Sequence, residues 1–204
     1  MGTTVLFGGT FNPLHIGHLE MLRTLDSLPE VDKVLLLPDK IPPHKRQSFA
    51  VDDEIRIEMC RLALAGLKKS ELCLIEFERQ GKSYTFDTVT ALKEKYPEEE
   101  FWFACGGDMI STLDTWYRSE ELLKLCGFYA FERLGTEGFT SALVRLREMG
   151  ANIRVLNAEI PEVSSTEVRE SLQKGVYDER LPELIRDYLA QNKVYEEGAN
   201  DEGL

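Results

Sequence analysis

Residues 8–18 combine a glycine turn with two histidines in an order that suits the binding of an anion: Gly-Gly-Thr-Phe-Asn-Pro-Leu-His-Ile-Gly-His. Gly8 and Gly9 let backbone amides approach a ligand closely. A helix that follows offers unpaired N–H groups and a positive dipole end in its first turn. His15 and His18 are three residues apart, so both project to one side of that turn, and the glycine between them leaves a ligand unobstructed. The segment predicts a phosphate site in which two imidazoles donate hydrogen bonds to anionic oxygens.

Two other interpretations of these histidines stay open. With His44 as a third ligand they could bind a metal ion, although Lys45 and Arg46 follow His44 and would repel a cation. They could also be incidental residues of a plain strand–turn–helix. We favour the phosphate site and expect no metal held by protein side chains alone.

Residues 164–169, Ser-Ser-Thr-Glu-Val-Arg, form a second candidate anion site at the start of another helical pattern. Arg169 follows Ser165 and Thr166 by about one helical turn, which places a guanidinium fork beside a helix start. The alternative is a serine cap with an arginine that faces solvent. Because the chain also holds the histidine segment, the anion site is the stronger interpretation.

A second glycine pair, Gly106-Gly107, ends an apolar run and precedes Asp108. The glycines permit close approach to a nucleoside, and the carboxylate can accept hydrogen bonds from ribose hydroxyls. A simple turn is the alternative.

The loop at 38–49 is stiffened by prolines and carries Lys40, His44, Lys45 and Arg46. Local positive charge of this kind can concentrate an anion even when the whole chain is acidic. A solvated loop is the alternative.

Aromatic residues at two places suit a ring-shaped ligand. The faces of Trp116 and Tyr117, and that of Tyr84, can stack on an aromatic ring. Thr85 follows at a helix start, where its hydroxyl and backbone amide can donate to a carboxylate. The alternative is that these aromatics anchor the core.

Signatures of several other enzyme classes are missing. Gly81-Lys82-Ser83 resembles the end of a Walker loop, but that motif needs a glycine five positions before Gly81, and the residue there is Glu76. The motifs GxGxxG and GxSxG do not occur either. Cys105 and Ser165 have no partnering His–Asp arrangement, so we expect no covalent nucleophile.

An alternating series of strands and helices must position these residues. Apolar runs predict strands at 4–7, 34–37, 72–75, 101–105, 128–131 and 153–156, and helical spacing predicts helices at 16–28, 52–67, 85–95, 119–125, 141–149, 165–174 and 182–191. Strict alternation predicts an α/β, doubly wound, mainly parallel sheet with helices on both faces. Such sheets bind ligands at the carboxyl ends of their strands, near the switch point.

Charge and composition exclude several classes of protein. The 204 residues carry 24 Lys and Arg against 36 Asp and Glu, a net charge of −12, which argues against nucleic acid as a partner. No apolar run approaches the roughly 18 residues of a membrane span, and the start lacks the basic region of a signal peptide. The four cysteines show neither metal nor disulfide spacing and indicate reduced, mostly buried thiols. We therefore expect a cytoplasmic protein with no membrane partner.

The GGTF-N-P loop followed by His-x-Gly-His resembles the signature of the nucleotidyltransferase superfamily. Further segments, in order between about residue 4 and residue 195, resemble bacterial nicotinate-mononucleotide adenylyltransferases: PDKIPPHK at 38–45, SYTFDT at 83–88, GDM at 107–109, TWY at 115–117 and VSSTEVR at 163–169. The resemblance implies one Rossmann-like nucleotidyltransferase domain over 1–195, with C-terminal helices from about 165 packed on it. Residues 196–204 are expected to form an acidic tail.

The resemblance also implies a reaction. ATP and nicotinate mononucleotide give deamido-NAD and pyrophosphate by in-line attack without a covalent enzyme intermediate, with Mg²⁺ bound through the ATP phosphates. The protein then contributes positioning and charge stabilisation. Two alternatives stay open: another transferase of this loop type, such as phosphopantetheine adenylyltransferase, or a non-catalytic regulator that binds nucleotide. The oligomeric state is left open, a homo-oligomer included.

Roles implied by the resemblance fall on matching residues. The catalytic set is Thr10, His15, His18 and Arg169. The ATP-binding set is Gly8, Gly9, Thr10, Phe11, His18, Gly106, Asp108, Ser165, Thr166 and Arg169. The set that binds the acceptor is Lys45, Tyr84, Thr85, Trp116 and Tyr117. The chain departs from the family at Asp39, often Asn, and at Leu134, often Pro after the arginine, so Asp39 and Arg133 receive no role.

Overall fold

Six parallel strands form one sheet, in the order β3-β2-β1-β4-β5-β6, in the computed structural model, which describes residues 2–40, 51–132 and 138–196. The strands are β1 Thr3–Gly9, β2 Lys33–Pro38, β3 Ser70–Leu72, β4 Glu100–Gly106, β5 Gly127–Phe131 and β6 Ile153–Leu156. Every pairing in this described sheet is parallel, which confirms the predicted fold class.

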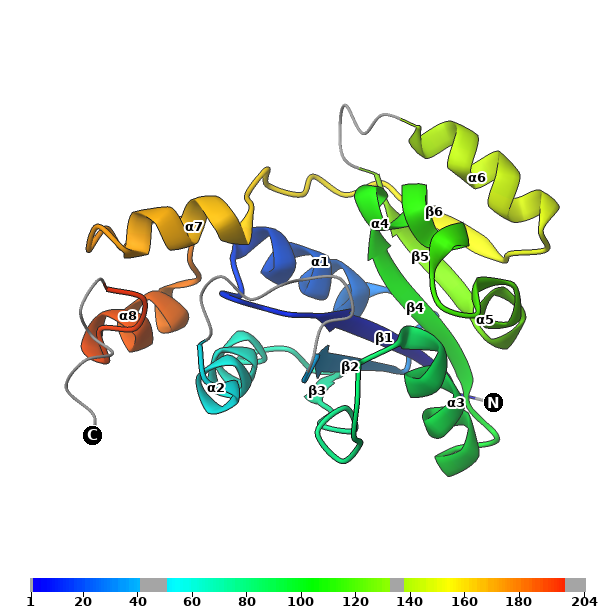
Figure 1. Cartoon of the computed structure of the whole chain (residues 1–204), viewed down its shortest axis with the longest axis horizontal. Coiled ribbons are helices and arrows are strands. Elements are labelled where there is room, and N and C mark those ends of the chain that lie inside the picture. Colours follow the sequence, from blue (N-terminus) through cyan, green and yellow to red (C-terminus); the bar gives the residue numbers. More distant parts are fainter. Residues whose placement is uncertain (1, 41–50, 133–137, 197–204) are drawn as a thin grey trace.

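Helices connect the strands and extend beyond them. They are α1 Ile16–Ser27, α2 Asp53–Ala63, α3 Thr85–Lys95, α4 Gly107–Thr112, the 3₁₀ helix η1 Leu113–Thr115, α5 Ser119–Leu125, α6 Phe139–Glu148, α7 Ser165–Leu172 and α8 Glu183–Gln191. Figure 1 shows the sheet in the middle of the molecule, α7 and α8 at one end, and α5 and α6 at the other. None of the helices within the described ranges has the length and apolarity needed to cross a bilayer.

The central strand β1 is buried on both faces, and its side chains enter two different hydrophobic clusters. Val5 and Phe7 pack with residues of α1, α2, α7 and α8, whereas Leu6 packs with residues of α3, α4, α5 and α6. Alternate side chains of a strand point to opposite faces, so helices cover both faces of the sheet as predicted. The two C-terminal helices share the core of the helices that follow β1 and β2.

The main differences from prediction concern the position of β3, the end of α2 and the presence of α4. The strand expected at 72–75 lies at 70–72, where it pairs with Val34–Leu36 of β2, and the chain then turns. Helix α2 ends at Ala63, about four residues early, and Gly66 follows in the left-handed conformation that commonly ends helices (φ 82°). The short helix α4 was not predicted, because its six residues are too few to show a helical period.

The winding of the chain reverses beside β1. Connections after β1 lead to β2 and β3 on one side, and the chain then returns to β4 on the other side. The carboxyl ends of β1, β2 and β4, at Gly9, Pro38 and Gly106, therefore open at one edge of the sheet. This edge is where sheets of this kind bind ligands.

Candidate functional site

A cavity of about 420 Å³ opens at that edge and collects most of the predicted site residues. Its lining includes Gly8, Gly9, Thr10, Phe11, His18, Tyr84, Thr85, Gly106, Asp108, Trp116, Tyr117, Ser165 and Arg169. These residues come from segments up to about 160 positions apart, so the fold brings the separate predicted motifs to one place. His15 and Thr166 are not among the lining residues.

Residues 8–13, called here the glycine loop, leave β1 and form one wall of the cavity. Phe11 adopts a positive φ of 48°, which is uncommon for a residue other than glycine, and the Asn12–Pro13 peptide is cis. The ring of Phe11 is 2% exposed and meets the ring of His18 edge-on, with centroids 5.2 Å apart. The loop thus places its aromatic side chain against the imidazole that lines the cavity.

His15 and His18 cap the start of α1 reciprocally. The amide of His15 donates to Nδ1 of His18 (3.3 Å), and the amide of His18 donates to Nδ1 of His15 (3.4 Å). Their rings are stacked, with centroids 3.7 Å apart. A ring nitrogen that accepts a hydrogen bond carries no proton, so each neutral imidazole has its proton on Nε2. His18 therefore offers an Nε2–H donor at the cavity, while His15, 2% exposed, holds the cap.

The prediction of unpaired amides in the first turn of α1 is wrong for two of them. The amide of Ile16 donates to the carbonyl oxygen of Arg180 (2.9 Å), and that of His18 is bound to His15. The His18 imidazole, rather than these helix amides, is the donor that this turn places at the cavity.

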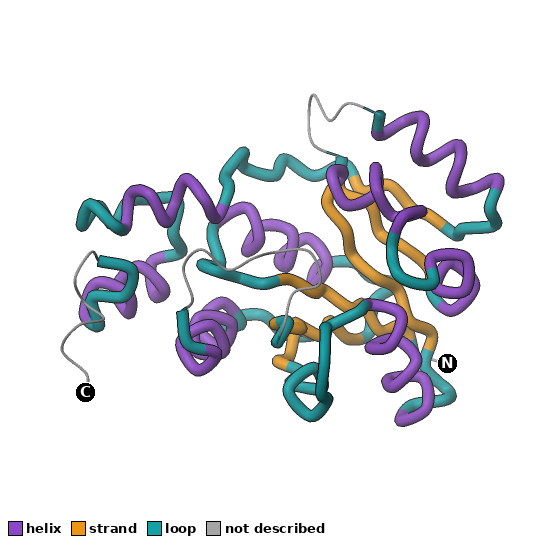
Figure 2. The backbone as a smooth tube through the Cα atoms, in the orientation of Figure 1, coloured by secondary structure: helices purple, strands orange, loops and turns teal. Residues whose placement is uncertain are grey.

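Gly17 has a role in packing. A Cβ atom there would lie 3.1 Å from the carbonyl oxygen of Pro161 and 3.2 Å from the His15 ring. Figure 2 shows the long connection 157–164 passing α1 on its way from β6 to α7. A side chain here would have to displace this connection or the His15 ring by a few tenths of an ångström, so the structure gives glycine a packing reason beside the predicted one, and Gly17 is not among the residues that line the cavity.

Helix α7 contacts the glycine loop directly. The Ser165 hydroxyl donates to the carbonyl oxygen of Pro13 (3.0 Å), and Arg169 Nη1 donates to that of Asn12 (2.6 Å). Arg169 Nη2 also donates to the hydroxyl of Thr166 (3.1 Å), which is exposed. The two predicted anion segments therefore meet, and Ser165 and Arg169 face the same cavity as His18.

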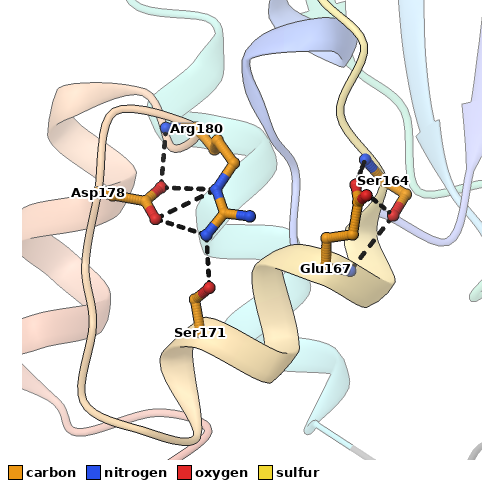
Figure 3. A network of polar contacts seen from close by, with 5 residues as sticks. All are labelled: Ser164, Glu167, Ser171, Asp178 and Arg180. Atoms are coloured by element: carbon orange, nitrogen blue, oxygen red, sulfur yellow. Dashed lines mark hydrogen bonds and ion pairs between the residues drawn. The ribbon is translucent and has the colours of Figure 1, made fainter.

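The start of α7 carries its own acidic cap (Figure 3). The Ser164 hydroxyl accepts from the amide of Glu167 (3.2 Å), and the Glu167 carboxylate accepts from the amide and hydroxyl of Ser164 (3.0 and 2.8 Å). These hydrogen bonds hold the pKa of Glu167 below its usual value. The Ser164 amide is therefore already bound to an anionic group of the protein.

The link between α7 and α8 is held by Arg180. Its guanidinium pairs with Asp178 and donates to the hydroxyl of Ser171 (Figure 3). Because the carbonyl of Arg180 accepts the Ile16 amide, this link also supports the start of α1.

A buried arginine of α2 supports the glycine loop from another side, and sequence reasoning missed it. Arg56 is 1% exposed, and its Nη1 donates to the carbonyl oxygen of Thr10 (2.9 Å). It pairs with Asp53 and with Asp39, whose Oδ1 lies 3.5 Å from Nη1. The Thr10 hydroxyl donates to Asp39 Oδ2 (3.0 Å), so Asp39 also belongs to this group and lines the cavity.

A helical face was available as a signal for Arg56. Counting apolar residues alone favours a face of α2 with Ile55 and Leu62, both of which are only partly buried. The face that is buried is spaced at i, i+3, i+4 and i+7: Arg56, Met59, Cys60 and Ala63. A charged residue in register with a buried face indicates an internal partner.

The end of β4 forms the next part of the cavity. A Cβ atom on Gly106 would lie 2.8 Å from Oδ1 of Asp108, so glycine leaves room for the carboxylate in its present position, from which a larger residue would displace it. Asp108 is exposed in the first turn of α4, and Met109 and Thr112 of the same helix line the cavity beside it. This arrangement suits hydrogen bonding to a hydroxylated group such as ribose.

A second side of the cavity consists of aromatic side chains and so differs in chemistry from the glycine loop. Its residues, called here the aromatic wall, are Tyr84, Trp116 and Tyr117. The rings of Tyr84 and Tyr117 have centroids 4.5 Å apart, and Trp116 meets Phe103 edge-on at 6.1 Å. Tyr117 is 47% exposed and Trp116 is half-buried. The wall therefore presents ring surface to the cavity without being sealed in the core.

Helix α3 begins beside this wall at Thr85. Its N-cap is Tyr84, which makes no side-chain capping hydrogen bond. The prediction that Thr85 is itself the cap is therefore off by one residue. A helix start without a side-chain cap leaves its first amides for other acceptors.

Contacts at the edge of the cavity hold α3 in place. Glu76, 8% exposed, accepts a hydrogen bond from the hydroxyl of Thr88, and Arg79 pairs with Asp87 at 3.2 Å. Glu76 and Thr88 line the cavity and were not predicted. The signal for Thr88 is the motif 83–88, of which only the first residues were given a role, whereas Glu76 lies outside that motif.

Several predicted groups lie outside the described residues. They are His44, Lys45 and Arg46 of the basic loop, Arg133, and all of the tail after Glu196. Their predicted roles stay predictions.

Neither a thiolate nucleophile nor a metal cluster emerges from the parts of the chain that the structure describes. Cys105, next to Gly106, is fully buried, and burial raises the pKa of its thiol well above the ordinary value. All four cysteines are free, and three of them are buried, as predicted. Within the same ranges, no three His, Cys, Asp or Glu side chains gather as a metal site requires.

Comparison with known proteins finds relatives that share one enzyme name. The sequence matches the model of a cytidylyltransferase-like family over residues 6–171. It is 38% identical over 194 residues to nicotinate-nucleotide adenylyltransferase of Bacillus subtilis strain 168, covering 94% of this chain and 97% of that protein. A probable nicotinate-nucleotide adenylyltransferase of Bacillus cytotoxicus is 39% identical, with 94% and 97% of the two chains covered.

Solved structures share the fold. One is Plasmodium falciparum nicotinic acid mononucleotide adenylyltransferase complexed with NaAD, with a TM-score of 0.79, 21% identity, and 96% of this chain and 98% of that chain covered.

Proposed function

The chain belongs to the nicotinate-nucleotide adenylyltransferase family, and we propose that it transfers the adenylyl group of ATP to nicotinate mononucleotide. The products are deamido-NAD and pyrophosphate. One observation carries the proposal: a single cavity joins the glycine loop, His18 and Arg169 on one side to the aromatic wall on the other. Such a cavity can hold a polyphosphate and a ring-shaped acceptor together, at the strand ends where this fold binds ligands.

We assign the triphosphate to the side formed by the glycine loop and α7. His18 and Arg169 are donors there, and Ser165 lies beside them. Asp108, at the end of β4, is assigned to the ribose of ATP. ATP is taken as its magnesium complex, because Mg²⁺ keeps several waters and prefers phosphate oxygens to protein ligands.

The acceptor is assigned to the aromatic wall and the start of α3. A pyridine ring can stack on Trp116 or on Tyr117. The amides and hydroxyl at Thr85 can donate to the nicotinate carboxylate, which distinguishes the acid from the amide. A site built from donors rejects the amide in part because donors would be left unpaired. Lys45 is assigned to the mononucleotide phosphate on the family's pattern alone.

The proposed chemistry is a direct transfer. A phosphate oxygen of the acceptor attacks the α-phosphorus of ATP in line, the bond from that phosphorus to the bridging oxygen breaks, and pyrophosphate leaves with the electron pair. The Nε2–H of His18 and the guanidinium of Arg169 stabilise negative charge that shifts toward pyrophosphate. His15 acts through the reciprocal cap, which sets the tautomer of His18. Backbone amides of residues 8–11, that of Thr10 included, are assigned as further donors, whereas the Thr10 hydroxyl donates to Asp39 in this structure.

Pyrophosphate release with magnesium ATP and one acceptor at a time tests the proposal. We expect nicotinate mononucleotide to give the fastest turnover, ahead of nicotinamide mononucleotide and phosphopantetheine, with a reaction lacking acceptor as the baseline. Faster turnover of phosphopantetheine would assign the chain to a different transferase. Tight ATP binding by calorimetry with no turnover of any acceptor would indicate a regulator. The names of the matched relatives favour neither of these alternatives.

A further inference from the structure

The backbone of the glycine loop is held by three donors from two distant segments. Arg56 of α2 donates to the carbonyl of Thr10, and Arg169 and Ser165 of α7 donate to those of Asn12 and Pro13. Because Phe11 has a left-handed backbone conformation, this loop depends on its surroundings to keep its shape.

Tyr195 is a fourth donor, and it differs from the others in what it binds. Its hydroxyl donates to Oδ1 of the Asn12 side chain at 2.5 Å, across 183 positions of sequence. Asn12 is 8% exposed and lines the cavity. The hydroxyl therefore fixes which end of a cavity-lining amide faces the protein, whereas the contacts of the other three donors with the loop are to backbone carbonyls.

The surroundings of Tyr195 commit its hydroxyl to this contact. Desolvation raises the pKa of the phenol, an effect that the nearby Arg169 and Arg56 charges oppose only in part, so the hydroxyl stays protonated and a donor. Tyr195 itself has a positive φ of 73°. The next residue, Glu196, accepts a hydrogen bond from the Tyr177 hydroxyl at 2.9 Å, and this contact helps to hold the backbone beside Tyr195.

We propose that Tyr195 is a positioning residue for adenylyl transfer, acting through the Asn12 side chain on the glycine loop. The inference rests on the proposed function, because it assigns the loop wall to the reacting phosphates. Tyr195 does not touch the reactants. Its hydroxyl holds Asn12, and Asn12 lies between Phe11, which contacts His18, and Arg169, whose guanidinium binds the carbonyl of the same asparagine.

The test compares Tyr195→Phe with Tyr177→Phe. Each substitution removes one hydroxyl and one hydrogen bond from the same end of the chain, but only the first bond reaches the loop. We expect Tyr195→Phe to lower kcat about tenfold, which corresponds to about 1.4 kcal/mol in the barrier. The KM for ATP should change less than about threefold, and Tyr177→Phe should stay within about twofold of wild type, because binding energy realised only in the transition state appears in kcat.

Thermal unfolding of both variants separates positioning from folding. A purely structural role predicts a lower Tm with an unchanged kcat per folded molecule, and that result would overturn the inference. If the wild-type chain fails to turn over nicotinate mononucleotide, the proposed function fails instead, so the two failures are distinguishable.

A double-mutant cycle tests whether Tyr195 acts through Asn12. In an Asn12→Ala background, we expect Tyr195→Phe to change kcat less than about twofold, because the partner that it positions is gone. An undiminished tenfold loss in that background contradicts the assigned route.

Discussion

The two sides of the cavity are built in opposite ways. The glycine loop is fixed by hydrogen bonds from Arg56, Arg169, Ser165 and Tyr195, of which Arg56 is buried and the other three are partly buried. The aromatic wall is fixed by ring contacts, and Tyr117 at its edge is 47% exposed. Directional bonds hold donors at set distances, whereas stacked rings tolerate sliding.

This difference matches what each side has to do. Stabilising charge in a transition state needs donors that are placed in advance and do not reorganise. Recognising a ring by its face needs area rather than exact placement, and half-exposed side chains supply area while still letting the ligand enter. We therefore expect changes on the loop side to lower the rate or the stability, and changes on the aromatic side to lower affinity.

The largest loss is expected from Arg56→Met. The substitution leaves Asp39, Asp53 and the carbonyl of Thr10 without their cation, and breaking a buried charge pair in this way costs about 3–5 kcal/mol of unfolding free energy. Urea denaturation measures it. The control is Arg61→Met on the same helix, whose side chain is 59% exposed and pairs with Glu58 at 3.1 Å; its loss should stay below about 1 kcal/mol. Equal losses in the two variants would contradict the buried network.

His18→Ala should lower kcat by roughly 10²–10³-fold, the scale for removing one preplaced donor. Steady-state pyrophosphate release measures the effect, and His18→Gln, which keeps an N–H donor, should recover part of it. Because His18 also caps α1, the unfolding temperature of each variant is measured alongside. Unchanged turnover in the alanine variant would remove His18 from the reaction.

Trp116→Ala tests the aromatic wall, where we expect a loss of affinity rather than of rate. We expect the Kd for nicotinate mononucleotide to rise about tenfold, within the range of an aromatic contact plus its buried area, with ATP affinity unchanged. Calorimetric titration measures both affinities. Tyr96→Ala, which removes an aromatic outside the cavity, is the control. Equal affinities before and after would return Trp116 to a role in packing.

The smallest effect concerns pH and the link between α7 and α8. The hydrogen bond from Arg180 lowers the pKa of Asp178 below the ordinary aspartate value of 3.8. A carboxyl with a lowered folded pKa contributes stability above its unfolded pKa and loses it as pH falls through the folded pKa. Asp178→Asn should therefore cost less than about 1 kcal/mol at neutral pH, because both side chains of the pair are partly exposed to solvent (32% and 28%), which screens the interaction. The difference from wild type should shrink as pH falls below 3.8. A difference that stays constant down to acid pH would show that the charge contributes nothing.

Much of the fold was predictable, because parallel strands that are buried on both faces are recognisable in the sequence as short apolar runs. β1 and β4 lie within a residue or two of prediction. β3 was misplaced because Cys73 to Ile75 are as apolar as a strand, yet Ile75 is buried after the chain has turned. Pattern alone does not show which of two overlapping apolar stretches pairs with β2.

The site was predictable where function depends on local sequence, and less so where it depends on distant partners. The glycine loop, His18 and Arg169 follow from spacing within single segments. Arg56 and Tyr195 act on the loop from 40 or more positions away, and although the buried face of α2 marks Arg56 as internal, no local pattern names the loop as the partner of either residue. The occupied amide of Ile16 was missed for the same reason, since the carbonyl of Arg180 lies in another part of the chain.

The support of the glycine loop by a residue 183 positions later in the chain has a consequence for biosynthesis. A ribosome makes the loop well before Tyr195, so the nascent chain carries an unfinished centre while the positions between them are translated. A chain that terminates early, before Tyr195, would leave the Asn12 side chain without this donor, and one that also lacks α7 and α8 would leave the core beside β1 incomplete.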